Sequence, residues 1–568
     1  MMVPLSTSSE ERLMTQASII PKVFTWGVLA AVAPGLAAAQ EAPVCLAQPT
    51  QPGQPPVLAP NRIALALFLA SKPQDMPGCT MEVRDGRIQI APPTSNAAMS
   101  CPDMFSWKLF AESVKAEFWK GWATDPQTWP VDPYPLCGPA GTAGACCTPG
   151  AANNPGYDDA SNPAVHCPYF PGDHLTAQTA PRVLTASPLS KAHLTPFTGP
   201  LGRSGMPGVA TATAIEPGRK IRQSMAELVF RNKPMLDFVF GKDIYHQQGL
   251  QRVFKQNHDY QNASTAPYRR KNAPNVLTEI EFPADTLMIK SDWLAEERAR
   301  EMGLRDDPAN PYVKITIESP VYDNNGVILE KGVHWLVAIH FSSKDIPNWV
   351  WTTFEHVHNP GRCDYTGCND SYGYATPDQV SADQETNYTS PHFQCDNLLL
   401  GSWIYDLAKP YPGGTRSQGL AQVFSGLGIG NGSAPPPGPD GTIVPSPADP
   451  AWLSYRLKGS QTEFVDATGQ PTRLGNSVTE GGFVNTSSCM TCHSRASISA
   501  KGSIPPALSV FISETSETGY LQSARGAPGP DWFRASNQPP ALAALQTDFV
   551  WGFLNANCIA SQPNEYCK

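Results

Sequence analysis

The stretch VHWLVAIHFSSKDIPNWVWTTFEHVH, residues 333–358, decides the fold of this chain. Val333–Phe341 and Trp349–His358 are rich in β-branched and aromatic residues, a composition that is typical of strands. The seven residues Ser342–Asn348 that separate them can join the two strands as an antiparallel hairpin. The sequence therefore predicts a β-rich centre for the protein.

Four histidines lie on these two predicted strands. Because side chains alternate along a strand, His334 and His340 should share a face of the first strand. By the same alternation, His356 and His358 share a face of the second strand, and Glu355 lies on its other face. Imidazoles at this spacing suit ligation of a metal or the polar lining of a metal site, although a single histidine is more often a hydrogen-bonded structural residue.

Helices and further strands are predicted on both sides of the hairpin. Apolar residues recur at helical spacing through Met104–Trp122, with Asp103 as a candidate N-cap, and two more helices are predicted at Ile221–Phe230 and Asp292–Met302. The remaining predicted strands are Thr278–Phe282, Thr286–Lys290 and Tyr312–Ile317. The predicted fold class is α+β, with a β-rich central body, peripheral helices and long loops.

The N-terminus has the pattern of an export signal. Lys22 precedes the apolar stretch Val23–Leu36, which ends in three alanines at 37–39, as the cleavage site of a secretory peptide does. The sequence predicts a signal peptide over residues 1–39 and a periplasmic or otherwise exported mature protein. The apolar run is shorter than the ~20 residues that a spanning helix needs, so no stable membrane span is expected after cleavage. An uncleaved anchor is the alternative.

The segment Cys489-Met-Thr-Cys492-His493 matches Cys-x-x-Cys-His, the attachment motif of c-type haem. Its two thiols can add to the haem vinyl groups, and the adjacent imidazole is an axial ligand to iron. One covalent haem c is therefore predicted at Cys489, Cys492 and His493. A redox dithiol or half of a zinc site is the alternative, which the lack of a second Cys-x-x-Cys in the sequence disfavours.

The chain beyond the motif offers no second axial ligand, because residues 494–568 contain neither methionine nor histidine. A small cytochrome c normally supplies its sixth ligand from this side of the motif. Either the rest of the protein donates the ligand, or the iron stays open to a small molecule. The candidate metal ligands are His493, His356 and His340, with His356 ahead of His340. The candidate catalytic residues are His356 and Glu355, the latter as an acid/base or orienting carboxylate.

The chain after the signal peptide is predicted to have three parts. Residues 40–425 form a mixed α/β body, and the Pro/Gly-rich stretch 426–449 is a linker or an insertion. Residues 450–568 form a mostly helical or irregular, cytochrome c-like haem segment.

Charge and cysteine content narrow the partners and the compartment. The formal net charge of -9 argues against nucleic acid as a partner. Of the 14 cysteines, twelve lie outside the haem motif, and an even remainder in an exported chain is typical of disulfides. The two pairings that close short loops are expected first: Cys363 with Cys368, and Cys558 with Cys567.

Several motifs resemble those of a family of largely uncharacterised bacterial exported monohaem cytochrome c proteins. They are W-x-W-x-T-F-E-H-V at Trp349–Val357, S-S-C-M-x-C-H at Ser487–His493, and shorter matches at Phe105–Phe110, Asn476–Glu480 and Asp548–Trp551. The resemblance implies that the β-rich region and the haem segment form one functional unit. Aspartate often stands in the family where this chain has His358, which makes His358 a poorer ligand candidate than His356.

The sequence predicts a periplasmic c-type haem redox protein, in first place a haem-dependent oxidoreductase whose distal side is built by the N-terminal body. A body of this size exceeds what carrying one electron requires. Two alternatives stay open: an electron-transfer cytochrome c with a six-coordinate haem, and a haem-based sensor or binding protein for a small ligand. The expected partner is a periplasmic redox protein or a small-molecule substrate.

Overall fold

The structure is a computed structural model in which the chain divides into two compact units, Met1–Ala42 and Pro43–Lys568. All described residues belong to the second unit, so the predicted signal peptide at 1–39 lies outside them. The described residues are 75–91, 96–138, 145–151, 166–173, 217–263, 275–317, 321–323, 326–329, 331–361, 368–375, 414–465, 472, 474–481, 487–500, 526–529, 532–534 and 541–567.

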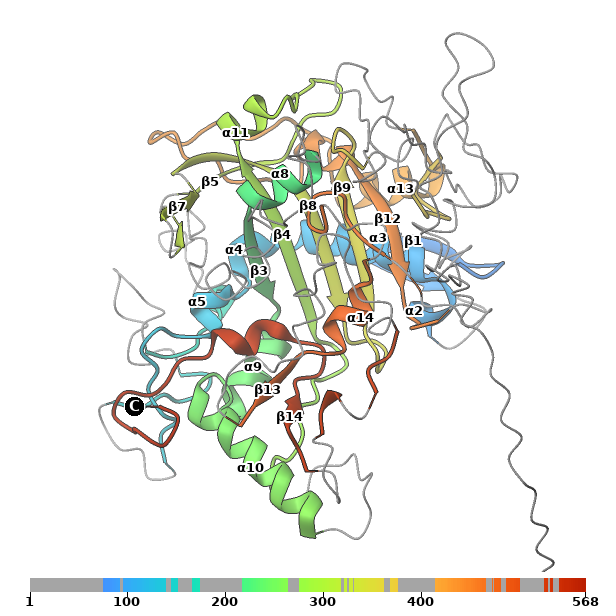
Figure 1. Ribbon diagram of the computed structural model, residues 1–568. Helices are drawn as coiled ribbons and strands as arrows, with labels where there is room; N and C mark the ends of the chain where they lie inside the picture. Colours follow the sequence, from blue (N-terminus) through green and yellow to red (C-terminus); the bar gives the residue numbers. More distant parts are fainter. Residues whose placement is uncertain are drawn as a thin grey trace, which may run out of the picture. The chain divides into compact units, whose positions relative to one another are not determined.

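A six-stranded antiparallel sheet forms the centre of the described part, which confirms the α+β class (Figure 1). The strand order is β12-β9-β8-β4-β3, and β5 pairs with β8 beyond the end of β9. The predicted hairpin is confirmed, because β8 and β9 pair antiparallel from Ala338–Glu355 to Ser343–Val350. The strands are β3 Ala226–Arg231, β4 Leu287–Ala295, β5 Lys314–Ile317, β8 Gly332–Ser343, β9 Val350–His356 and β12 Tyr455–Gln461.

Strand β12 comes from the segment predicted as a separate haem part, yet it pairs with β9 over its whole length. The Pro/Gly-rich stretch before it also contacts the sheet, where the backbone of Ile443 exchanges hydrogen bonds with Thr316. The predicted boundary at 426–449 therefore falls between strands of one sheet.

One face of the sheet carries a large apolar core. Helix α3 (Pro102–Lys115) crosses this face, behind the sheet in Figure 1, and helix α13 (Gln418–Leu427) packs beside it. Trp107 and Phe110 of α3 are fully buried and contact Phe354 of β9, with ring centroids 4.8 and 4.9 Å apart. The helical spacing seen in the sequence thus marks the residues that cover the sheet.

The predicted helix Met104–Trp122 is shorter than expected. α3 ends at Lys115, and α4 (Phe118–Gly121) follows after Glu117, whose φ of 51° breaks the helix. Asp103 is not the N-cap but lies in the first turn, where its backbone N–H donates to the Asp75 carboxylate at 2.8 Å.

The other face carries a second apolar cluster at the lower end of the sheet in Figure 1. Trp349 and Trp351 at the start of β9 belong to it, together with Met490. The elements on this side are α9 Lys233–Gly241, α10 Gln247–Ala263, α14 Cys489–His493, β13 Ser497–Ser499, β14 Ala544–Gln546 and η9 Trp551–Asn555.

The remaining elements are short and lie around the sheet. The hairpin of β1 (Thr80–Arg84) and β2 (Arg87–Ala91) packs on α13 and α3. The others are α2 Ala97–Ser100, α5 Asp125–Thr128, η1 Pro171–Asp173, α8 Pro217–Ser224, α11 Glu296–Glu301, β6 Val321–Asp323, β7 Gly326–Leu329, β10 Tyr374–Ala375, β11 Thr415–Arg416 and η3 Pro450–Ser454. Among the described helices, none has the length and apolar character that crossing a bilayer requires.

Two predicted helices are wrong in part because sheet pairing decides the local structure. The structure has the end of α8 and then β3 at Ile221–Phe230. It has the end of β4 and then α11 at Asp292–Met302. Strands that are buried on both faces lose the alternation that marks a strand in the sequence. Thr278–Phe282 is not a strand but an extended connection.

Disulfides join nearly all the cysteines of the described part. The prediction of Cys558–Cys567 is confirmed, and Cys368 is disulfide-bonded, while its predicted partner Cys363 lies outside the described residues. The other described bridges are Cys79–Cys101, Cys137–Cys146 and Cys147–Cys167.

A β-bulge in β8 separates two histidines that alternation placed together. Asp292 of β4 pairs with Ala338, but the next residue, Trp293, pairs with Leu336, so one residue of β8 is extra. Because of the extra residue, strict alternation along β8 does not continue through the bulge, and residues an even number apart across it lie on opposite faces of the sheet. His340 therefore lies on the face opposite to His334, and the prediction of a shared face is wrong.

Candidate functional site

Helix α14 holds the Cys-x-x-Cys-His motif and is fixed at its N-terminus by β12. The Ser488 side chain accepts a hydrogen bond from the N–H of Thr491, as an N-cap does. Gln461, the last residue of β12, donates to Ser488 Oγ at 2.9 Å and accepts from the N–H of Met490 at 3.1 Å. Met490 is fully buried in the second apolar cluster, so the motif is docked on the end of the sheet.

The two cysteines of the motif are free thiols. Cys489 and Cys492 are spaced i, i+3 on α14, which places them on one side of the helix. Every other cysteine in the described part of the chain is in a disulfide. Burial raises the pKa of Cys492 to about 11 and that of Cys489 well above its ordinary value. Both groups are therefore neutral thiols rather than reactive thiolates.

His493 is held by a backbone carbonyl and by an aromatic ring. Its Nδ1 lies 2.9 Å from the carbonyl oxygen of Phe549, and its ring centroid is 4.3 Å from that of Trp351. A carbonyl oxygen can only accept, so the hydrogen bond places the proton on Nδ1 and leaves the lone pair on Nε2. Burial lowers the pKa of His493 to about 4, and the imidazole is neutral near pH 7. This is the tautomer and charge state of a metal-ligating histidine.

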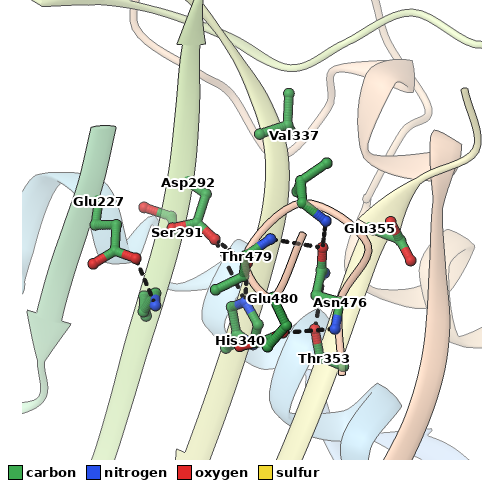
Figure 2. A network of polar contacts seen from close by, with 12 residues as sticks. Glu227, Ser291, Asp292, Val337, His340, Thr353, Glu355, Asn476, Thr479 and Glu480 are labelled. Carbon is green, nitrogen blue, oxygen red and sulfur yellow. Dashed lines mark hydrogen bonds and ion pairs between the residues drawn. The ribbon is translucent and has the colours of Figure 1, made fainter. Parts of the chain in front are cut away.

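A row of charged side chains lies on the same face of the sheet as Trp351. Lys290 of β4 pairs with His340 of β8, and Asp292 pairs with Ala338 two positions further on. Residues directly opposite in an antiparallel pair share a face, so these side chains form one polar row. Lys290 Nζ also forms an ion pair with Glu227 of β3 at 2.7 Å (Figure 2).

The hydrogen bonds of His340 fix which of its ring nitrogens is free. The Thr479 hydroxyl donates to the Asp292 carboxylate, and His340 Nε2 lies 2.8 Å from the same hydroxyl oxygen (Figure 2). Because the hydroxyl proton points to Asp292, the oxygen must accept from Nε2–H. The neutral imidazole then carries its lone pair on Nδ1, for which no partner is found among the described residues.

Burial and the neighbouring cations set the charges in this row. Burial opposes ionisation of Asp292, but Lys290 and His340 outweigh it and lower the pKa of Asp292. Burial also disfavours the cation of Lys290, but the surrounding carboxylates, Glu227 foremost, raise its pKa above the ordinary value. Glu480 lies close to the same groups, and burial raises its pKa. Lys290 and Asp292 are both charged near neutral pH.

The connection 474–481 covers the polar row and supplies Thr479. Asn476 anchors it to β9, because its side-chain amide donates to Thr353 Oγ1 at 3.0 Å and to the Phe354 carbonyl at 3.1 Å. The N–H of Asn476 donates to Glu480 Oε2 at 2.6 Å, which closes the connection on itself. Figure 2 shows this segment lying over β8 and β9.

The polar row and the motif are electrostatic neighbours. Besides burial, Lys290 and His340 both lower the pKa of His493. Glu480 raises the pKa of Cys489, and Lys290 lowers it. The structure therefore places Lys290 and His340 within electrostatic range of His493, on the face of the sheet that carries Trp351.

His356, the first ligand candidate in the sequence, lies elsewhere. Its ring stacks on Tyr312 with centroids 3.5 Å apart, its Nε2 is 3.2 Å from the Pro311 carbonyl, and its Nδ1 accepts the His358 N–H at 3.1 Å. Trp351, which contacts His493, is five positions away on β9. At ~3.3 Å per residue this is roughly 17 Å, and an odd separation puts the two side chains on opposite faces. The structure does not bring His356 to the motif.

Glu355, the other catalytic candidate, is committed to buried contacts. It accepts a hydrogen bond from the Ser477 hydroxyl and pairs with Lys458 at 3.1 Å. It is 2% exposed and Lys458 is 1% exposed. This carboxylate neutralises a buried cation and ties 474–481 to the sheet, which is a structural role.

Sequence reasoning missed Lys290, Asp292, Thr479 and Glu480. Lys290 and Asp292 share a face of β4, but the sequence predicts a helix from Asp292 onward, which hides this common face. Thr479 and Glu480 stood inside the motif Asn476–Glu480, and that motif was the one signal that could have pointed to them.

Comparisons with protein-family models, with curated proteins and with solved structures found no match to the chain.

Proposed function

We propose that the protein is a c-type haem redox protein, exported to the periplasm, and that it acts as a haem-dependent oxidoreductase. Cys489 and Cys492 would attach the haem, and His493 would ligate its iron. The N-terminal body would supply the polar groups beside the haem through β4 and β8.

The observation that carries the proposal is the state of the three motif residues. Two thiols stay free where the other described cysteines are paired, and both lie on one side of a short capped helix. The neighbouring imidazole has its Nδ1 proton bound to the Phe549 carbonyl, so its Nε2 lone pair is available to a metal. These donors fit haem c, which needs two thiols and one neutral imidazole. They do not make up a closed zinc site, which needs four ligands.

Haem held there would supply an iron centre that exchanges single electrons. The protein's own residues would set the surroundings of that centre. Trp351 packs on the ring of His493 and limits its rotation. His340 offers a lone pair on Nδ1, while Asp292 holds its orientation through Thr479. Such a base can accept or donate a proton at a substrate as the electron moves.

The state of His340 also supports a second candidate function. A neutral imidazole with a free Nδ1 and a hydrogen-bonded Nε2 is equally suited to ligate iron. If His340 took the sixth position, the haem would be closed to small molecules, and the protein would be an electron-transfer cytochrome.

Production in a host that matures c-type cytochromes tests the proposal. The intact mass of the purified chain is expected to include one covalent haem, and the Cys489→Ser, Cys492→Ser double variant is expected to lack it. Absence of haem from the unmodified chain would overturn the proposal.

Visible and electron paramagnetic resonance spectra then separate the two candidates. An oxidoreductase with an open iron is expected to be high-spin and to bind cyanide readily. A low-spin spectrum that resists cyanide would reject the oxidoreductase and support the electron-transfer protein.

A further inference from the structure

The chain makes a tight turn at Thr547–Val550, directly after β14. The Val550 N–H donates to the Thr547 carbonyl at 2.9 Å, and the two central residues have positive φ, 46° at Asp548 and 69° at Phe549. Positive φ at both central positions is typical of a type I′ turn, which glycine, asparagine and aspartate dominate. Asp548 suits this conformation, but Phe549 adopts a backbone conformation that its own residue type disfavours.

The Asp548 carboxylate holds this turn with three hydrogen bonds. Its Oδ1 accepts from Lys344 Nζ at 2.6 Å and from Trp349 Nε1 at 3.2 Å, and its Oδ2 accepts from the Phe282 N–H at 2.7 Å. Asp548 and Lys344 are buried. Trp349 itself has a φ of 61°, so the carboxylate joins two turns that both contain left-handed residues.

The turn presents one functional atom, the carbonyl oxygen of Phe549. This oxygen accepts the Nδ1 proton of His493 at 2.9 Å. Backbone conformations of this kind persist only where the surroundings impose them, and they cluster at functional sites. A hydrogen bond to the second imidazole nitrogen fixes the ring's orientation and makes the ligating nitrogen more basic.

We propose that Asp548 is a positioning residue for the haem iron: by holding the turn 547–550, it aims the Phe549 carbonyl at His493 and so fixes that ligand's orientation and basicity. The inference rests on the proposed haem attachment. A more basic axial imidazole stabilises ferric over ferrous iron, so the arrangement keeps the reduction potential low.

A purely structural role for the buried Asp548–Lys344 pair predicts something different. Loss of the pair would then lower the stability of the protein and leave the iron's electronic properties unchanged. The potential and the spectrum of the iron therefore distinguish positioning from stability alone.

The test uses the haem-loaded full chain with Asp548→Ala, Asp548→Asn and, as a matched control, Asp345→Ala. Asparagine tolerates positive φ, and its Oδ1 can accept from Lys344 and Trp349, although its amide nitrogen cannot accept from the Phe282 N–H. It therefore removes the charge and keeps two of the three contacts that hold the turn. Asp345 is exposed in the same connection as Lys344 and does not contact the turn. The readouts are the midpoint potential and the electron paramagnetic resonance spectrum of the ferric protein.

Asp548→Ala is expected to shift the potential upward and to broaden or displace the ferric signals. Asp548→Asn is expected to restore most of the unmodified values, and Asp345→Ala to match them fully. An unchanged potential and spectrum in Asp548→Ala would overturn the inference. An equal shift in Asp548→Asn would also overturn it, because the charge and not the turn would then be responsible.

A variant that fails to accumulate, or a chain without haem, also has a defined consequence. If Asp548→Ala does not accumulate, Asp548→Ser, which loses part of the hydrogen bonding, replaces it with the same expectation. If the unmodified chain carries no haem, the proposed function and this inference both fail. If haem is attached and Asp548→Ala behaves as the unmodified chain does, only this inference fails.

Discussion

His340 and His356 lie on neighbouring strands of one sheet, but the sheet gives them opposite surroundings. His340 is on the face that carries Lys290, near the Cys-x-x-Cys-His motif, and one of its ring nitrogens has no partner among the described residues. His356 is on the other face, stacked on Tyr312, with both ring nitrogens bound to backbone groups. Residue type and strand position suggested the same role for both. The face of the strand and the hydrogen-bond partners separate them.

The same contrast holds for two buried aspartates. Asp292 lies beside Lys290 and His340, and these neighbours lower its pKa despite its burial. Asp370 lies beside Asp103, and burial together with this second acid raises its pKa to about 7. The buried Asp292, at the proposed haem site, is therefore charged near neutral pH. The buried Asp370, under α3, is neutral at pH values below its pKa of about 7.

The largest expected effect separates the motif from the other cysteines. The Cys489→Ser, Cys492→Ser double variant should lose all covalent haem, because no thiol remains to form the thioether bonds. The Cys558→Ser, Cys567→Ser double variant removes a disulfide that closes a short loop and should keep haem at full stoichiometry. Intact mass measurement checks both. Loss of haem from the second variant as well would show that haem retention follows general stability and not the motif.

His356→Ala is expected to destabilise the protein without changing the haem. The variant leaves a cavity and unpairs two buried backbone groups, which should cost about 2–4 kcal/mol in the free energy of unfolding. Urea denaturation of the oxidised chain measures this cost, and His258→Ala, at a partly exposed histidine of α10, serves as the control with little loss. A cost below that of His258→Ala would contradict the buried environment assigned to His356.

Asp370 should contribute to the pH dependence of stability, beside Asp75 and Asp103, whose pKa values burial also raises. Its folded pKa of about 7 exceeds the ordinary value of 3.8, so the folded state binds the proton more tightly than the unfolded state does. Stability is then greatest below about pH 4 for this group and falls as the pH rises to about 7. Asp370→Asn should reduce the change of the urea-unfolding midpoint with pH across this range. A midpoint that rises with pH in the unmodified chain, with the same pH dependence in the variant, would contradict the assignment.

The smallest expected effect concerns the support of His340. Thr479→Val removes the hydroxyl between Asp292 and His340 and should cost about 1–2 kcal/mol in the free energy of unfolding. Thr352→Val on β9 is the matched control, because the buried Thr352 hydroxyl has no hydrogen-bond partner in the described part of the chain, and its removal should be neutral or stabilising. Equal costs in the two variants would mean that the link from Asp292 to His340 contributes nothing.

The sequence was sufficient for the hairpin at the centre of the fold and for most of the helix that covers it. β-Branched and aromatic runs around a polar connection predicted β8 and β9, and helical spacing predicted most of α3. These features depend on local composition and period. The free state of Cys489 and Cys492 follows from the same motif, which set them apart from the disulfide cysteines.

The partners of the motif were not predictable, for two physical reasons. The bulge opposite Asp292 and Trp293 reverses the face of β8, and no residue of the sequence marks an extra residue in that strand. The polar row also combines β3, β4, β8 and the connection 474–481, which are joined only by long-range pairing. Alternation within one strand could not choose between His340 and His356.

The haem spectra of His340→Ala and His356→Ala in the loaded protein test the placement of the haem most directly. We expect that His340→Ala changes the ferric visible spectrum or the cyanide affinity, and that His356→Ala leaves both as they are in the unmodified chain. The reverse result, an altered spectrum in His356→Ala with His340→Ala unchanged, would contradict the placement of the haem beside the polar row.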